Sequence, residues 1–513
     1  MNTTDSDVPT HVGVAIAGGG FGGVGAAIQL TRNGIDDYLL FERATELGGT
    51  WQANTYPGAQ CDIPSALYSF SFAPNPEWTR LYPLQEEIKS YIERCADDYD
   101  VPAHTRLGTD VRSADWDELA QVWRIVTVDR TGTERSWTAT FLLLATGPFS
   151  EPSVPDLPGL SEFGGRIFHS AEWDHDYDLA GKSVAVIGTG ASAVQFVPQI
   201  QPKVQALRLF QRTPTWILPH PDQPIAPALQ DAFRRIPWAQ RAMRGSFALV
   251  QEMMVPGLVR EPALLKPMAA AGRHHLRRQV TDPELRAKLT PTYEFGCKRP
   301  TFSNTYYPAL TASNAEVITD SIERVTATGI VTADGAEHAV DAIIFGTGFK
   351  LTANEGFGRI RGTDGRSLAE VWAGEMRAYL GTMVTGFPNM FMMLGPNSVV
   401  YTSQVVTIEA QLDFVIDALK TMGRRWIRSI DVTPTAQQAF VDEVDKGLTS
   451  SVWNTGGCSS YYLSGSGRNF TFWPGFVFTM RHRMRRIRLS DFSIRMAGRG
   501  RTATSSEKVL VAR

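Results

Sequence analysis

Two short apolar runs, each ending in glycines and leading into an amphipathic segment, stand out in the pattern of hydrophobic and polar positions. The first covers residues 12–17, and the same order recurs at residues 183–187. An apolar run before glycines predicts a buried strand and a tight turn, and the helical periodicity after it predicts a helix. Residues 141–145 and 342–345 are further buried-strand candidates, each leading to a Thr-Gly step. Two such openings indicate an α/β fold with two doubly wound sheets.

The string GGGFGG at residues 18–23 follows the first apolar run. Its Gly18, Gly20 and Gly23 satisfy GxGxxG, in which glycine lets the backbone turn tightly and approach a pyrophosphate at a helix N-terminus. The next strand ends in Glu42, whose carboxylate can accept hydrogen bonds from ribose hydroxyls. Three glycines can also be ordinary turn chemistry. The strand before them, the helix after them and the acid together predict dinucleotide binding.

A second string, GTGASA at residues 188–193, repeats the motif with alanine at the last position. Gly188, Thr189, Gly190 and Ser192 are its candidate cofactor contacts. The position that corresponds to Glu42 is Arg212, which can pair with a ribose 2′-phosphate. We therefore interpret the first loop as an FAD site and the second as an NADPH site. The alternative is that Arg212 is only a solvated residue at a strand end.

These features predict two Rossmann-like dinucleotide-binding domains with a helical insertion. A proline-rich connector at residues 150–160 marks a boundary, and residues 224–289 show a helical pattern. The expected order along the chain is the FAD-binding domain, first part, at 1–150; the NADPH-binding domain, first part with its linker, at 151–223; the helical insertion at 224–292; the second part of the NADPH-binding domain at 293–344; and the second part of the FAD-binding domain with the C-terminal tail at 345–513.

Composition and charge narrow the possible partners. Hydrophobic residues make up 43% and charged residues 20% of the 513 residues, and 50 Lys+Arg against 53 Asp+Glu give a net charge of −3. This balance gives no general attraction to nucleic acid or anionic membrane. We interpret the run RHRMRRIR at residues 481–488 as a solvated face rather than a membrane or nucleic-acid site. No stretch of about 18 apolar residues exists, so we expect no membrane span.

The four cysteines (Cys61, Cys95, Cys297 and Cys458) lie far apart and form no CxxC pair. They suggest neither a disulfide framework nor a zinc site, and they are typical of a reducing cytoplasm. The first ten residues are polar and acidic, unlike a signal peptide, so we expect a cytoplasmic protein.

A protein with two dinucleotide folds could be a disulfide reductase, a dehydrogenase or a monooxygenase. A disulfide reductase needs a redox-active cysteine pair near the flavin, and the sequence indicates none. Two strings discriminate further. Residues 163–174 read FGGRIFHSAEWD, which fits FxGxxxHxxxW followed by an acid, and residues 49–62 read GTWQANTYPGAQCD.

These two strings resemble the signatures of the type I (class B) flavin-dependent Baeyer–Villiger monooxygenases. The resemblance extends to ATG at 145–147, KRP at 298–300 and GTGF at 346–349, and the tail string GGCSSYY at 456–462 is similar to one branch of the family. That branch usually has tryptophan where Tyr461 stands, which puts any borrowed substrate in doubt.

The resemblance implies that FAD and NADPH are the cofactors and that a small-molecule ketone and O2 are the partners. NADPH reduces the flavin, oxygen adds at its C4a atom, and the peroxide attacks the ketone carbonyl to give an ester or lactone. The alternative is an N- or S-oxygenating flavin monooxygenase, and a non-catalytic flavin or NADPH sensor is a candidate of another class. The oligomeric state is open between monomer and homodimer.

The chemistry requires a fixed cation beside the flavin, and Arg299 is the residue that matches the family motif. Asp62 is its matched partner, a carboxylate that can orient the guanidinium. Lys298 matches a second contact to the 2′-phosphate, alongside Arg212 and Thr213. Asp62 and Arg299 are also candidate cofactor contacts. The others are Phe21, Thr50, Trp51, Tyr68 and Val111, although Trp51 and Tyr68 could be ordinary core aromatics. His169 is interpreted as a structural residue of the linker, and no metal site is expected.

Overall fold

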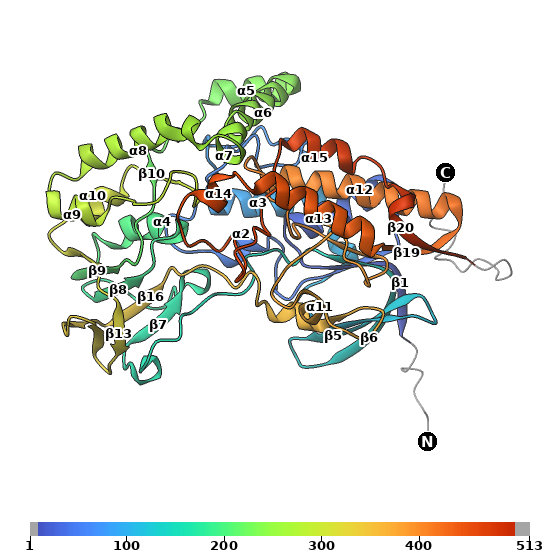
Figure 1. The fold of residues 1–513 in the computed structure, drawn as a ribbon, viewed down its shortest axis with the longest axis horizontal. Helices are drawn as coiled ribbons and strands as arrows, with labels where there is room; N and C mark the ends of the chain where they lie inside the picture. The colour runs from blue at the N-terminus through green and yellow to red at the C-terminus, as the bar shows by residue number, and fades with distance from the viewer. Residues whose placement is uncertain (1–8, 498–513) are drawn as a thin grey trace.

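A computed structural model of the chain describes residues 9–497 and contains two α/β sheets at opposite ends of the molecule (Figure 1). The larger sheet has eight strands in the order β17-β4-β5-β6-β1-β2-β3, with β18 also paired to β6. Their bounds are β1 Thr10–Ala17, β2 Tyr38–Phe41, β3 Thr105–Arg106, β4 Thr109–Asp117, β5 Val122–Asp129, β6 Glu134–Leu144, β17 Ile360–Arg361 and β18 Met390–Met392. All four residues of β2 are buried, as expected for a parallel strand covered on both faces.

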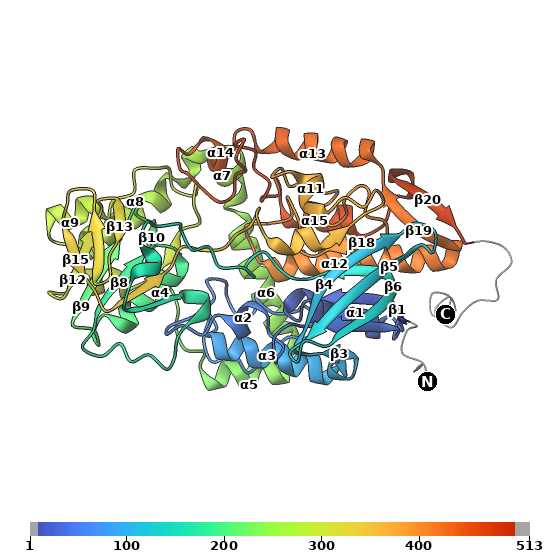
Figure 2. The same cartoon turned by 90° about the horizontal axis from the view of Figure 1, so that it is seen from below.

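The second sheet has five strands in the order β12-β9-β8-β16-β7, all parallel. Its strands are β7 Arg166–His169, β8 Ser183–Ile187, β9 Ala206–Phe210, β12 Ala315–Ile318 and β16 Ala342–Phe345. The strands predicted at 183–187 and 342–345 are therefore confirmed. A small antiparallel sheet of β13 (Ile322–Val325), β14 (Gly329–Thr332) and β15 (Glu337–Ala339) adjoins it. Figure 2 shows the two main sheets again separated along the long axis.

A set of helices lies along the upper edge of Figure 1, within residues 224–292. They are α5 Pro227–Arg235, α6 Pro237–Glu252, α7 Val255–Val259, α8 Lys266–Gln279 and α9 Pro283–Lys288. The segment leaves and rejoins the second domain through two short parallel strands, β10 (Ile217–Leu218) and β11 (Thr301–Phe302). The helical character predicted here is confirmed, while the exact domain bounds stay a prediction.

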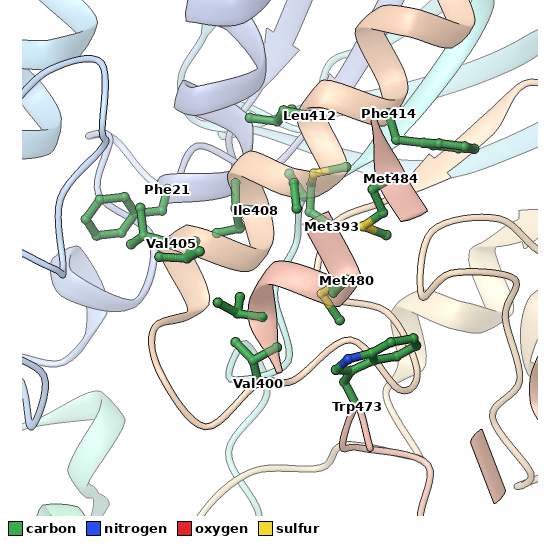
Figure 3. Close-up of a cluster of buried hydrophobic side chains, with 14 of the residues drawn as sticks. Phe21, Met393, Val400, Val405, Ile408, Leu412, Phe414, Trp473, Met480 and Met484 are labelled. Atoms are coloured by element: carbon green, nitrogen blue, oxygen red, sulfur yellow. The ribbon is translucent and has the colours of Figure 1, made fainter. Parts of the chain in front are cut away.

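The two ends of the chain share one core around the larger sheet. Helix α1 (Phe21–Arg32) packs against α12 (Gln404–Arg425), which in turn packs against α15 (Val477–Met484). Figure 3 shows α12 side chains in this core, with Phe21 on one side and Met480 and Met484 on the other. The other helices are α2 Thr50–Ala53, α3 Gln85–Asp98, α4 Ala191–Ile200, α10 Tyr306–Leu310, α11 Leu368–Trp372, α13 Pro434–Leu448 and α14 Val452–Thr455, and β19 (Ile427–Val432) pairs with β20 (Phe492–Met496).

The cysteines correct one expectation. Cys297 and Cys458 form a disulfide, although 161 residues separate them, while Cys61 and Cys95 are free and buried. The wide spacing of the cysteines in the sequence did not indicate this pair, because the two cysteines meet only when the tail folds back onto the loop that contains Cys297. The cysteine pattern therefore no longer supports a reducing compartment. No helix within residues 9–497 is long and apolar enough to cross a membrane.

Candidate active site

The first glycine loop connects the end of β1 to α1. Gly18 has φ +106°, and a Cβ there would lie 2.6 Å from the carbonyl oxygen of Ala145, so the turn requires glycine. A Cβ on Gly23 would lie 1.8 Å from the carbonyl oxygen of Gly18, which shows how closely the helix approaches the loop. The N-cap of α1 is Gly20, with no side-chain cap and no acid in the first turn. The N–H groups at this helix end are therefore placed to bind a pyrophosphate.

Glu42 lies directly beyond β2 and is fixed against this loop. Its buried carboxylate accepts hydrogen bonds from the backbone N–H groups of Gly19 (2.6 Å) and Ala44 (2.7 Å). Its carbonyl oxygen accepts from the N–H of Thr109 at 2.8 Å, and the predicted contact Val111 lies two residues further along β4. Glu42 thus stands beside the helix N-terminus, where the ribose of a dinucleotide would lie.

Three of the predicted flavin contacts form an aromatic group at the start of α1. The indole N–H of Trp51 donates to the Tyr68 hydroxyl at 3.1 Å, and the rings of Phe21 and Tyr68 meet edge to face with centroids 5.2 Å apart. Thr50 begins α2 directly after Gly49, and a Cβ on Gly49 would lie 2.7 Å from the Cα of Gly20. The structure therefore brings these residues together with the first glycine loop.

The second glycine loop repeats this geometry between β8 and α4. Gly188 has φ +110°, and Gly190 is the N-cap of α4, again with no side-chain cap and no acid in the first turn. The Thr189 hydroxyl donates to the carbonyl oxygen of Thr213 at 2.8 Å, and Ser192 lies in the first turn of α4. Since Thr213 follows Arg212, this bond ties the loop to the predicted 2′-phosphate contact.

Arg212 and Lys298 form a cationic pair beside the second loop. Burial, with the positive field of Arg212 in addition, lowers the pKa of the half-buried Lys298. Arg212 is exposed, and neither side chain forms an ion pair with a residue between positions 9 and 497. Two neighbouring cations without a carboxylate partner fit a dianionic 2′-phosphate.

Arg299 and Asp62 form an ion pair that connects the two dinucleotide domains. The Arg299 Nε–H donates to Asp62 Oδ2 at 2.8 Å, and the two side chains are 32% and 35% exposed. Burial by itself would lower the pKa of Arg299, but the charge and hydrogen bond of Asp62, together with Tyr401 and Tyr462, outweigh burial and raise the pKa above its usual value. The guanidinium is therefore a permanent cation with one edge oriented by Asp62.

Sequence reasoning missed several neighbours of Arg299. The guanidinium carbon of Arg299 lies 5.8 Å from the ring centroid of Tyr401, and its backbone N–H donates to the Tyr462 hydroxyl at 3.3 Å. The hydroxyl of Tyr461 donates to that of Tyr462 at 3.4 Å, and Tyr461 is 56% exposed. The tail string already contained both tail tyrosines, but no motif marked Tyr401.

The same tail is fixed to the arginine loop by further contacts. Cys297, two residues before Arg299, carries the disulfide to Cys458, and the N–H of Glu294 donates to the carbonyl oxygen of Gly456 at 2.9 Å. A Cβ on Gly456 would lie 2.7 Å from the Cβ of Cys297. The loop and the tail therefore form one packed unit around the cation.

His169, at the end of β7, is buried beside Phe349, with ring centroids 5.8 Å apart. Its Nδ1 accepts a hydrogen bond from the N–H of Ala171 at 3.1 Å, and burial lowers its pKa to about 4. The ring is neutral near neutral pH. This environment supports the interpretation of His169 as a structural residue.

Two dinucleotide sites on separate α/β domains, joined by a partly exposed arginine–aspartate pair, define the class of NADPH-dependent flavoproteins. A protein-family profile described as pyridine nucleotide-disulphide oxidoreductase matches residues 15–248. The chain is 45% identical to a Baeyer–Villiger monooxygenase of Streptomyces coelicolor, over 95% of this chain and 93% of that protein. It is 47% identical to a Baeyer–Villiger monooxygenase of Pseudomonas aeruginosa, over 94% and 92%.

Solved structures agree with these relatives. Cyclohexanone monooxygenase from Rhodococcus sp. Phi1 bound to NADP+ matches with a TM-score of 0.85 at 29% identity, over 96% of this chain and 100% of that chain. Oxidised steroid monooxygenase bound to NADP matches with a TM-score of 0.83 at 31% identity, over 95% and 100%. The chain belongs to the Baeyer–Villiger monooxygenase family, whose members use FAD and NADPH to convert ketones to esters or lactones.

The predictions of the family, the α/β fold and the two cofactors are confirmed by these comparisons. The role of each site residue stays a prediction, because similarity along the whole chain does not test individual side chains. The profile's name refers to disulphide chemistry, but the nearly full-length relatives are monooxygenases.

Proposed function

We propose that Arg299, oriented by Asp62, stabilises the negative charge that develops on the ketone oxygen during ester or lactone formation. The observation that carries this proposal is the 2.8 Å ion pair at the junction of the two dinucleotide domains. When bound, FAD reduced by NADPH would activate O2, which supplies the oxygen atom inserted next to the ketone carbonyl. The chain supplies a fixed cation, and a preorganised donor in a site shielded from water is worth more than the same donor in solution.

Asp62 and the tyrosines hold the guanidinium in this position. Asp62 occupies Nε, so the terminal nitrogens remain available for substrate or cofactor oxygen. Tyr401 lies against the face of the cation, and the Tyr462 hydroxyl fixes the backbone at Arg299. An ammonium group would not satisfy this geometry, because lysine lacks the planar fork that Asp62 and a second acceptor can share.

The substrate that we propose is a small-molecule ketone, with O2 as the second reactant. A solved structure of cyclohexanone monooxygenase with cyclohexanone bound matches this chain with a TM-score of 0.80 at 28% identity, which supports this class of substrate. Tyr461 is the residue most directly placed to limit the size of the ketone that is accepted, since it is exposed and bonded to Tyr462 beside Arg299.

Arg299→Ala tests the proposal. The variant should keep its FAD, since none of the contacts around the first glycine loop involves Arg299, but ester formation should fall by at least about 100-fold. With cyclohexanone as the substrate, three quantities are measured in the same reaction: NADPH consumed, lactone formed and hydrogen peroxide released. The control is Arg124→Ala, which breaks an exposed ion pair with Asp117 on the β4–β5 hairpin and should leave ester formation unchanged. Normal ester yield from Arg299→Ala would refute the assigned role.

The compartment and the oligomeric state are proposals as well. We propose a cytoplasmic enzyme because it depends on NADPH, whose reduced pool cells maintain in the cytoplasm. The Cys297–Cys458 disulfide argues in the other direction, so thiol titration of the protein from intact cells would decide the point. For the oligomeric state we propose a monomer or a homodimer, which sedimentation velocity of the FAD-loaded protein would distinguish.

A further inference from the structure

The helical insertion exposes more large apolar side chains for its length than the rest of the described chain does. Of the 17 exposed large hydrophobic residues between positions 9 and 497, seven lie in residues 224–292, which make up only 69 of those 489 positions. These seven are Leu229, Ile236, Trp238, Leu249, Val250, Met253 and Leu264. Single exposed apolar residues are normal, whereas a concentration of them marks an interaction surface.

Helix α6 exposes apolar residues on its outer face although its inner face is only partly apolar. Phe247 and Ala248 pack against the core. Beside them Gln240 donates to the Asn75 carbonyl oxygen, Arg244 donates to the Ser69 carbonyl oxygen at 2.6 Å, and the Glu252 carboxylate accepts from the N–H of Val477 at 3.0 Å. The exposed face, read along the helix and one residue past its end, is Trp238, Arg241, Ala242, Gly245, Ser246, Leu249, Val250 and Met253. Only Arg241 on that face is charged. A helix that only met water would place its apolar residues inwards.

The exposed apolar face of α6 continues onto α15. The bond between Glu252 and the N–H of Val477 joins the end of α6 to the start of α15, so Phe478, which is 63% exposed, extends the apolar surface. A groove of about 1050 Å³ opens between α7, α13 and α15, with Phe478 and Trp473 among its lining residues. Figure 1 shows α5, α6 and α15 along the same edge of the molecule. We call α6 and the exposed side of α15 the apolar–basic surface.

The same region is basic although the whole chain is slightly acidic. Residues 224–292 contain 11 Lys and Arg against five Asp and Glu, and residues 481–488 contain five arginines and no acid. His482, Arg485 and Arg486 are exposed on and just after α15, and Arg260 and Lys446 line the groove. The groove is lined by four Lys and Arg residues against the single acid Glu443, so positive charge outweighs negative charge beside the exposed apolar residues.

We propose that the apolar–basic surface docks on an anionic lipid bilayer. This proposal replaces the expectation from the sequence that residues 481–488 form only a solvated face. Trp238, Leu249 and Phe478 would enter the headgroup boundary while the arginines pair with lipid phosphates, as in amphipathic helices that lie in a membrane interface. A second copy of the chain is a poorer match, because a two-fold contact would place these basic residues opposite one another. Nucleic acid would leave the apolar face of α6 without a partner.

The experiment is flotation of the FAD-loaded protein with vesicles of phosphatidylcholine alone and of phosphatidylcholine with phosphatidylglycerol in equal parts. We expect binding to the anionic vesicles only, and loss of binding at 0.5 M salt. Two double variants should each weaken binding at least about tenfold. One combines Trp238→Ser with Leu249→Ser, and the other combines Arg485→Glu with Arg486→Glu. The matched control is Leu119→Ser, because Leu119 is 97% exposed but lies in the β4–β5 turn.

Flavin content and unfolding temperature of each variant show whether it is folded. Equal binding to both vesicle types, no binding to either, or unchanged binding of both double variants would overturn the proposal. Sedimentation velocity without lipid tests the alternative that a second copy of the chain covers this surface. If the protein is a dimer and the double variant Trp238→Ser with Leu249→Ser is a monomer, the surface is assigned to a second copy instead.

Discussion

The two dinucleotide sites use the same loop and helix geometry but differ in how much of each site is fixed in advance. At the first site Glu42 is buried and already bonded to two backbone N–H groups, and Phe21 and Tyr68 pack beside Trp51. At the second site Arg212 is exposed, and both it and Lys298 lack a carboxylate partner among the described residues. A rigid, buried site suits a cofactor that stays, whereas an open pair of cations suits one that binds and leaves each turnover.

The helices of the two sites also approach their strands differently. The last motif position is Gly23 in the first loop and Ala193 in the second, and Ala193 is fully buried without a clash. A Cβ at Gly23 would instead lie 1.8 Å from the Gly18 carbonyl oxygen. The first helix therefore lies closer to its loop at this position than the second, and only glycine fits there.

Gly23→Ala should produce the largest effect of any single change at the two sites. The added methyl group cannot be accommodated without moving α1, so the variant should purify with little or no FAD and unfold at a lower temperature. Flavin absorbance per protein and the unfolding temperature report this. The reciprocal change, Ala193→Gly in the second loop, should keep full FAD content. A Gly23→Ala protein with full flavin occupancy would show that the two loops are equally tolerant.

Cys458→Ser removes the covalent connection between the Arg299 loop and the tail. Because 161 residues separate Cys297 from Cys458, opening this loop should lower the free energy of unfolding by about 2–5 kcal/mol. Denaturant unfolding under oxidising conditions measures the change. A thiol reductant should destabilise the unchanged protein by a similar amount and have no further effect on Cys458→Ser. If the reductant destabilises both equally, the disulfide is not the cause.

Local motifs could be predicted from the sequence, and contacts between distant segments could not. The glycine loops follow from backbone geometry within six residues, and Glu42 and Arg212 follow from the length of one helix and strand. Tyr401 and the Cys297–Cys458 pair depend on how the tail folds back, which no local pattern encodes. Periodicity predicted that residues 224–292 are helical, but not that Arg244 and Glu252 of α6 face inwards beside Phe247 while apolar residues stay exposed. The spacing of apolar residues along a helix does not say which face meets the core.

Arg212→Ala should weaken NADPH binding while leaving NADH nearly unaffected, because only NADPH carries a 2′-phosphate. One charge-assisted contact is worth about 1.5–3 kcal/mol, so the dissociation constant for NADPH should rise about 10- to 150-fold. Binding of both nucleotides to the oxidised protein is measured by titration. The control is Arg208→Ala, four residues earlier on β9, whose side chain donates to the Ala339 carbonyl oxygen instead. An equal loss for NADPH and NADH would mean that Arg212 does not contact the phosphate.

The pH dependence of NADPH binding gives the smallest and most specific difference between the two sites. Burial and the charge of Arg212 lower the pKa of Lys298, so its contribution is complete below that pKa and is lost as the pH rises through it. The loss therefore comes at a lower pH than for an ordinary lysine. Arg212→Ala removes one of the two causes of the lowered Lys298 pKa. In this variant the loss of NADPH affinity should therefore come at a higher pH, although NADPH binds more weakly at every pH. NADH provides the baseline, since its affinity should not follow this titration. A pH profile that is identical for both nucleotides would remove Lys298 from the phosphate site.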